Sequence, residues 1–253
     1  MSTAIFARLA LLDALRGGLP WLAAASAVLG AALAAFLSQV AVTESVSLQA
    51  AVVAAVLRAC AVFLVVSHVA SSTARELSDK TLEFTLALPL SRASQYLGRL
   101  AGFVACAVAL AIAFALPLLL WASPAAVALW GLSLACEAAL AAAIALFFSM
   151  TLTQLVPAIA ATLGLYVLAR AMAAIQLIAS GPLTEPSALS QVTRFAVDAV
   201  ALLLPRLDAV TRTEWLLYGP PSAGAYCMAL ASLAAYALLV IAAGLFDFHR
   251  RSL

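Results

Sequence analysis

The sequence predicts an all-α protein that crosses a membrane six times. Of the 253 residues, 66% are hydrophobic and 9% are charged, whereas a soluble domain carries about 45–50% apolar and roughly 25% charged residues. So few charges cannot cover so much apolar surface in water, which excludes an ordinary soluble enzyme, a disordered chain and a nucleic-acid-binding domain. The apolar stretches show no period-two alternation, so we expect helices rather than a membrane β-barrel.

Six apolar stretches are long enough to cross the hydrocarbon core as helices, which takes about 20 residues each. They are residues 19–40, 48–70, 97–121, 125–149, 156–179 and 223–246. We therefore interpret residues 1–253 as a single transmembrane domain. Three segments lie outside the spans, at residues 1–17, 71–96 and 180–222.

The basic residues predict the orientation of these spans, because Lys and Arg collect in cytoplasmic loops. Eight of the thirteen precede the first span, separate the second from the third, or end the chain: Arg8, Arg16, Arg75, Lys80, Arg92, Arg99, Arg250 and Arg251. An even number of spans puts these three places on one side of the membrane. Both termini and the 71–96 loop are therefore predicted to be cytoplasmic.

The N-terminal segment 1–17 is predicted to be an amphipathic helix on the cytoplasmic membrane surface. An apolar run follows Arg8, but Asp13 and Arg16 interrupt it before it reaches the length of a signal-peptide core. Gly17 and Gly18 should end this helix. The alternative is a simple extension of the first span.

The 71–96 loop predicts two short helical elements. Thr73-Ala-Arg-Glu76 is a capping box, so a helix should begin at Thr73 and stop at Pro89. Ser91 can cap a second helix that continues into the third span, where Gly98 and Gly102 allow another helix to approach closely. A short charged helix between two spans suits the docking of a cytoplasmic partner; the alternative is a solvated loop.

This loop resembles that of ABC-2 type permeases, the membrane subunits of ABC exporters. The resemblance lies in Glu76 followed by Lys80-Thr81-Leu82-Glu83, in Leu88-Pro89-Leu90-Ser91-Arg92 and in Tyr96-Leu97-Gly98-Arg99. Six spans, a surface helix before them and a long outer loop before the last span also fit that family. The chain departs from the family at Lys80, where many members have Gly, and at Arg99, where many have Lys.

Lys80-Thr81, together with residues 204–208 and 215–219, resembles one subgroup of these permeases. That subgroup is named for the maturation of multicopper enzymes, as in the nitrous oxide reductase gene cluster. No ladder of Met, Cys or His lines a span, so the sequence gives no support for copper as the transported species.

The resemblance implies that the loop contains a coupling helix, which sits in a groove of a nucleotide-binding subunit. Six residues would face that partner: Glu76, Asp79, Lys80, Thr81, Glu83 and Phe84. Pro89, Ser91 and Arg92 would set the turn into the third span. The family also implies an exporter in a bacterial inner membrane, in which two permease copies pair, most simply as a homodimer.

No ATP-binding motif lies in this chain. Its one lysine, Lys80, follows Asp79 and not the glycine that a phosphate-binding loop requires. We expect ATP and Mg²⁺ to bind in a separate ABC ATPase subunit, and we expect no catalytic residue, cofactor or metal site here. The lipid bilayer is the other expected partner, and we expect no binding of nucleic acid. Whether a periplasmic accessory protein binds the outer loop is left open by the sequence.

Three charged residues interrupt spans, where an ionisable group is costly and normally faces a partner or water. Arg58, Glu137 and Arg170 lie in the second, fourth and fifth spans. A rise of about 1.5 Å per residue places all three roughly 14–19 Å from the outer surface. They are predicted to cluster, with Glu137 pairing to one or both arginines. The cluster is either a structural ion pair or a polar part of a transport path suited to an anionic substrate.

The outer loop 180–222 predicts a helix over about 187–204, which Pro205 ends. Thr211-Arg-Thr-Glu214 is a second capping box and predicts a further helix.

Other classes of membrane protein fit less well. An intramembrane serine protease needs Gly-x-Ser-Gly, and Gly131-Leu-Ser133-Leu134 lacks the final glycine. A secondary transporter should show an inverted repeat with paired helix interruptions, which we do not find. A secondary transporter and a non-transporting membrane scaffold remain the alternatives to an exporter.

Overall fold

The computed structural model describes residues 2–40, 45–79, 91–180, 188–219 and 221–250. Within these ranges the chain forms helices and turns and no strand. Six of the helices are long and apolar enough to cross a membrane. The protein is thus an all-α, multi-pass membrane protein, as the sequence predicts.

The membrane-crossing helices follow the predicted apolar stretches closely. They are α2 (Leu19–Val40), α3 (Ser45–Ser78), α5 (Arg92–Ala115) with the 3-10 turn η1 (Leu116–Leu120), α6 (Pro124–Leu152), α7 (Leu155–Ala179) and α10 (Ala223–Arg250). Shorter helices precede and connect them: α1 (Ser2–Arg16), α8 (Ala188–Leu203), η2 (Leu207–Ala209) and α9 (Glu214–Leu217).

Helix α3 is longer than predicted, and it corrects the helix expected to begin at Thr73. Thr73 is a buried residue inside α3, which continues to Ser78. The 45–78 stretch contains neither Gly nor Pro to end the helix. The Ser72 hydroxyl donates to the Asp13 carboxylate and not to the backbone, and the Ser71 hydroxyl donates back to the His68 carbonyl within the helix.

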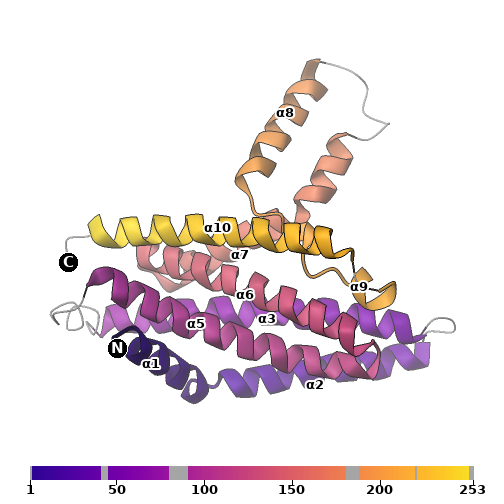
Figure 1. Ribbon diagram of the computed structural model, residues 1–253, viewed down its shortest axis with the longest axis horizontal. Coiled ribbons are helices and arrows are strands. Elements are labelled where there is room, and N and C mark those ends of the chain that lie inside the picture. The colour runs from indigo at the N-terminus through magenta and orange to yellow at the C-terminus, as the bar shows by residue number, and fades with distance from the viewer. Residues whose placement is uncertain (1, 41–44, 80–90, 181–187, 220, 251–253) are drawn as a thin grey trace.

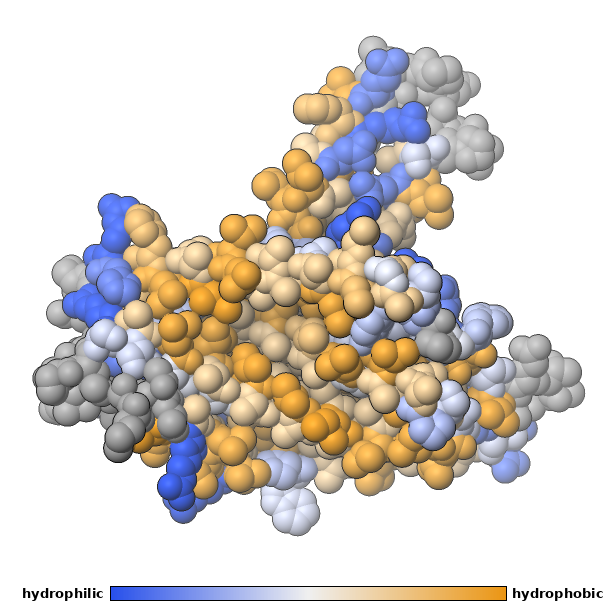
Figure 2. All heavy atoms as spheres, viewed as in Figure 1, coloured by the Kyte–Doolittle hydropathy of each residue, from blue (hydrophilic) through white to orange (hydrophobic). Residues whose placement is uncertain are grey.

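Helix α6 is the centre of the bundle and packs against α3, α5, α7 and α10 (Figure 1). Its alanines, such as Ala138, Ala142 and Ala145, are fully buried and let the neighbouring helices come close. By contrast, α2 and α10 leave most of their apolar side chains exposed. Figure 2 shows this hydrophobic surface spread over the visible face of the bundle, as expected of helices that face hydrocarbon.

Helix α1 forms the predicted separate segment, and it packs along α5. The contact is made by small residues: a Cβ added to Gly102 would lie 2.5 Å from the Cβ of Ala10. The larger side chains of Leu9 and Leu15 are exposed. Gly18 turns the chain into α2 with a φ of +86°, a conformation that glycine adopts without strain.

The start of α1, the end of α3, the start of α5 and the end of α10 lie at one end of the bundle, here called the loop end (Figure 1). Helix α9 and η1 lie at the opposite end, called the far end. Helix α8 stands away from the bundle beside the last part of α7. The six described basic residues among those that predict the topology come from chain segments gathered at the loop end: Arg8, Arg16, Arg75, Arg92, Arg99 and Arg250.

Candidate functional site

The described site residues form two groups, one at the loop end and one part-way along the membrane-crossing helices. Of the predicted partner-facing group, the structure describes Glu76, Asp79, Ser91 and Arg92. The other five predicted members lie outside the described residues: Lys80, Thr81, Glu83, Phe84 and Pro89.

Glu76 turns towards α5, where it forms an ion pair. Its Oε2 lies 3.0 Å from Nη2 of Arg99, whose side chain is only 6% exposed. The pair joins the last turns of α3 to the second turn of α5. Glu76, which was predicted to face a partner protein, is therefore engaged within the chain, and it ties together the two helices that flank the predicted coupling segment.

Asp13 of α1 forms a second connection at the loop end. Its Oδ2 accepts hydrogen bonds from Ser72 Oγ at 2.9 Å and from Arg75 Nη2 at 3.0 Å. Sequence reasoning saw Asp13 only as an interruption of an apolar run. Ser72 lies 59 positions further along the chain, and no local spacing links the two residues.

The start of α5 forms the third connection. The Ser91 hydroxyl accepts from the Ser94 backbone N–H at 3.2 Å, which confirms the predicted N-cap. Arg92 Nη1 donates to the carbonyl oxygens of Phe248 and His249 at 3.3 and 3.4 Å. These carbonyls belong to the last turn of α10, where a cation is favoured. Side chains at the loop end thus join α1, α3, α5 and α10.

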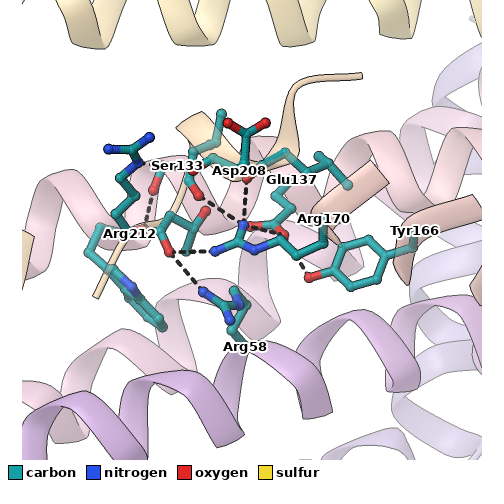
Figure 3. A network of polar contacts seen from close by, with 11 residues as sticks. Arg58, Ser133, Glu137, Tyr166, Arg170, Asp208 and Arg212 are labelled. Atoms are coloured by element: carbon teal, nitrogen blue, oxygen red, sulfur yellow. Dashed lines mark hydrogen bonds and ion pairs between the residues drawn. The ribbon is translucent and has the colours of Figure 1, made fainter. Parts of the chain in front are cut away.

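At membrane depth, the structure brings the predicted intramembrane residues together (Figure 3). Glu137 of α6 is 1% exposed. Its Oε1 accepts from the Tyr166 hydroxyl at 2.7 Å and pairs with Arg170 Nη1 at 3.4 Å. Tyr166 was not predicted, although its spacing of four residues from Arg170 puts both on one face of α7.

Arg170 also binds the chain between η2 and α9. Its Nη1 donates to the carbonyl oxygens of Leu207 at 2.6 Å and Val210 at 2.9 Å, and its Nη2 donates to that of Thr211 at 3.2 Å. Arg58 Nη1, from α3, donates to the same Thr211 oxygen at 3.0 Å. The two arginines thus meet at a backbone carbonyl, while Glu137 pairs with Arg170.

Thr211 adopts an unusual backbone conformation. Its φ is +52° and its side chain is fully buried, and such a conformation costs on the order of 1–3 kcal/mol for a non-glycine residue. This also corrects the second predicted capping box, because α9 begins only at Glu214 and has no side-chain cap. The four hydrogen bonds from the two arginines hold the 207–211 segment in place against that cost.

Two cavities flank the neighbouring 204–208 stretch. The larger, about 380 Å³, lies between α7 and α8 and has an apolar floor at Ala169 and Met172. Its polar lining residues are Gln176, Asp198, Arg206 and Asp208. The smaller, about 10 Å³, lies against Glu137 and Tyr166 and is about the size of one water. Pro205 lines both cavities, so the 204–208 stretch borders each of them.

These features define a class of protein: a multi-pass helical membrane protein with a buried charge cluster and a network of ion pairs at one end of the bundle. No protein-family model matches the chain, and no curated protein matches it. Among the residues that the structure describes, no three His, Cys, Asp or Glu side chains come together as metal ligands.

Proposed function

We propose that this chain is the membrane-spanning subunit of an ATP-driven ABC-2 type exporter. It acts as a dimer, most simply a homodimer, with a separate ABC ATPase subunit that binds ATP and Mg²⁺. The network at the loop end is the observation that carries the proposal, and the resemblance of the 71–96 loop supplies the family. The bacterial inner membrane as its location, and the multicopper-enzyme maturation subgroup, belong to the same proposal.

The loop-end network suits the transmission of movement from a cytoplasmic partner into the bundle. Glu76 and Arg99 fix the two flanks of the predicted coupling segment to each other. Removing one partner of a fully buried ion pair costs about 3–5 kcal/mol, and the 32% exposure of Glu76 puts this pair below that range. A push on the flanks therefore moves α3 and α5 together, instead of bending one of them locally.

The other connections extend this movement to two more helices. Asp13 links α1 to α3, and Arg92 links α5 to α10. When ATP binding draws the partner subunits together, the chain's own contribution is to carry the displacement of the loop end along these four helices. Transport follows when this displacement reaches the far end of the bundle and changes the arrangement of the helices there.

A charge reversal tests the proposal. The chain is purified from its native membrane, and ATP hydrolysis by the copurified complex is measured for the parent and for Glu83→Lys. We expect Glu83→Lys to lower ATPase activity or subunit assembly while membrane insertion stays normal. Glu214→Lys is the matched control, because Glu214 is an exposed acidic residue at the far end and its reversal should change neither.

The outcomes separate the proposed exporter from its alternatives. If no ATPase subunit copurifies, the chain is not an ABC-type subunit and a secondary transporter gains support. If an ATPase copurifies but its turnover does not respond to Glu83→Lys or to candidate substrates, a non-transporting scaffold is favoured. Substrate-stimulated turnover that Glu83→Lys abolishes supports the exporter.

A further inference from the structure

Arg58 and Arg170, here called the arginine pair, converge on one atom. Arg58 Nη1 and Arg170 Nη2 lie 3.0 and 3.2 Å from the carbonyl oxygen of Thr211, approaching from α3 and α7 (Figure 3). In the described part of the chain, this oxygen is the one hydrogen-bond acceptor recorded for Arg58, although a guanidinium carries five N–H donors. Two guanidinium groups directed at one oxygen provide the donor arrangement that carboxylates and phosphates favour.

The charge of the cluster is not balanced. The arginine pair contributes two positive charges and Glu137 one negative charge, which leaves a sum of +1 at membrane depth. Glu137 Oε1 pairs with Nη1 of Arg170, whereas Nη2 of Arg170 donates to the Thr211 carbonyl oxygen. Asp208 acts on Arg170 at longer range, without a hydrogen bond between the two side chains, and it also lines the large cavity. A backbone carbonyl supplies only a partial negative charge, and an anion would neutralise the pair better.

Thr211 is suited to being displaced. Its backbone is held at a φ of +52°, and its buried Oγ1 has no hydrogen-bond partner. Release of the 207–211 segment would relieve both costs. An anionic group that took the place of the carbonyl oxygen would keep both guanidinium groups paired.

We infer that the arginine pair is a binding site for an anionic group, a carboxylate or phosphate, which displaces the Thr211 carbonyl and releases the 207–211 segment. The 204–208 stretch, which overlaps the segment at residues 207 and 208, borders both cavities, so release of the segment changes the wall of each. An anion that binds only the released form shifts the equilibrium towards that form. The statement that this anion is part of the transported molecule rests on the proposed function. The statement that this chain binds an anion does not depend on it.

The test measures exposure of the 207–211 segment in the purified full chain in nanodiscs. The four native cysteines are replaced by alanine, and buried Val210 is replaced by cysteine as a reporter for a membrane-impermeant maleimide. Labelling rates are measured with decanoate, with acetate, and with decyltrimethylammonium as an amphiphile of opposite charge. We expect a saturable rise with decanoate and none with decyltrimethylammonium; a rise with acetate as well would assign the site to small soluble anions.

Variants of the arginine pair test whether the labelling response to decanoate depends on these two side chains. Arg58→Gln should raise labelling without any anion and weaken the decanoate response about tenfold or more, the loss expected for one charge-assisted hydrogen bond. Arg58→Lys keeps the charge and should retain part of the response. Arg194→Gln, an exposed arginine on α8, should change nothing.

Equal responses to decanoate and decyltrimethylammonium, or no response to either anion, would overturn the inference. So would a decanoate response in Arg58→Gln that matches the parent. The experiment needs no ATPase subunit, so its failure leaves the proposed exporter standing, and a failure of ATPase coupling leaves the anion site standing.

Discussion

Neutralising Glu137 should destabilise the bundle measurably, because this carboxylate is enclosed by the structure. The Glu137 side chain has no exposed surface, and Arg170 is only 21% exposed. In Glu137→Gln, Tyr166 keeps an oxygen acceptor close to its present 2.7 Å contact, but Arg170 loses its negative partner. Arg170 still has the carbonyl oxygens of Leu207, Val210 and Thr211, so the loss is smaller than for an isolated buried charge.

The expected loss is about 2 kcal/mol in the free energy of unfolding. It lies above the roughly 0.6–1.7 kcal/mol measured for hydrogen bonds within membrane bundles and below the 3–5 kcal/mol lost when a buried ion pair is broken completely. Equilibrium unfolding of the purified chain in mixed micelles measures it. Asp198→Asn, on an exposed carboxylate of α8, is the control and should stay within about 0.5 kcal/mol of the parent.

A double-mutant cycle with Arg170→Gln separates the ion pair from the rest of the cluster. If Glu137 and Arg170 stabilise each other, the double variant should lose clearly less than the sum of the two single losses. Additive losses, or a Glu137→Gln variant as stable as the parent, would refute the reasoning that this pair holds α6 to α7.

Three further predictions concern the loop end. Gly102→Leu should dislodge α1, because a Cβ there already meets Ala10; limited proteolysis of α1 should accelerate, whereas Gly164→Leu, with nothing within 4 Å, should leave it unchanged. Ser91→Ala should lower the free energy of unfolding by about 1 kcal/mol through loss of the N-cap, and an unchanged unfolding midpoint would contradict that role. Asp13→Asn should cost at most about 1 kcal/mol, since both partners of its ion pair are substantially exposed, and the difference from the parent should shrink in high salt.

The apolar spans could be predicted from the sequence because membrane helices are defined by composition over long windows. Helix α6 was predicted over 125–149 and runs over Pro124–Leu152. The meeting of Glu137 and Arg170 could also be predicted, because a fixed rise per residue converts sequence position into depth. Depth cannot give the direction in which a side chain points, so the role of Thr211 as the shared acceptor of two arginines was not predictable.

Both predicted capping boxes failed because a four-residue pattern reports only local preference. At Thr73, the continuous helix-forming sequence of α3 carries the chain through the pattern. At Thr211, hydrogen bonds from Arg58 and Arg170 hold the carbonyl in a position that a helix N-terminus does not allow. The partners of Asp13 lie in a helix that only tertiary packing brings near.

The loop-end network and the arginine pair differ in the kind of acceptor that their arginines bind. At the loop end, Glu76 pairs with the nearly buried Arg99 of a neighbouring helix, so separating α3 from α5 leaves the Arg99 charge without its partner. At the arginine pair, most acceptors are backbone carbonyls of a short connecting segment, and another oxygen ligand can replace them without separating any helices. In the proposed exporter, this difference would let the loop end move as a unit while an anion competes for the bonds that hold the 207–211 segment.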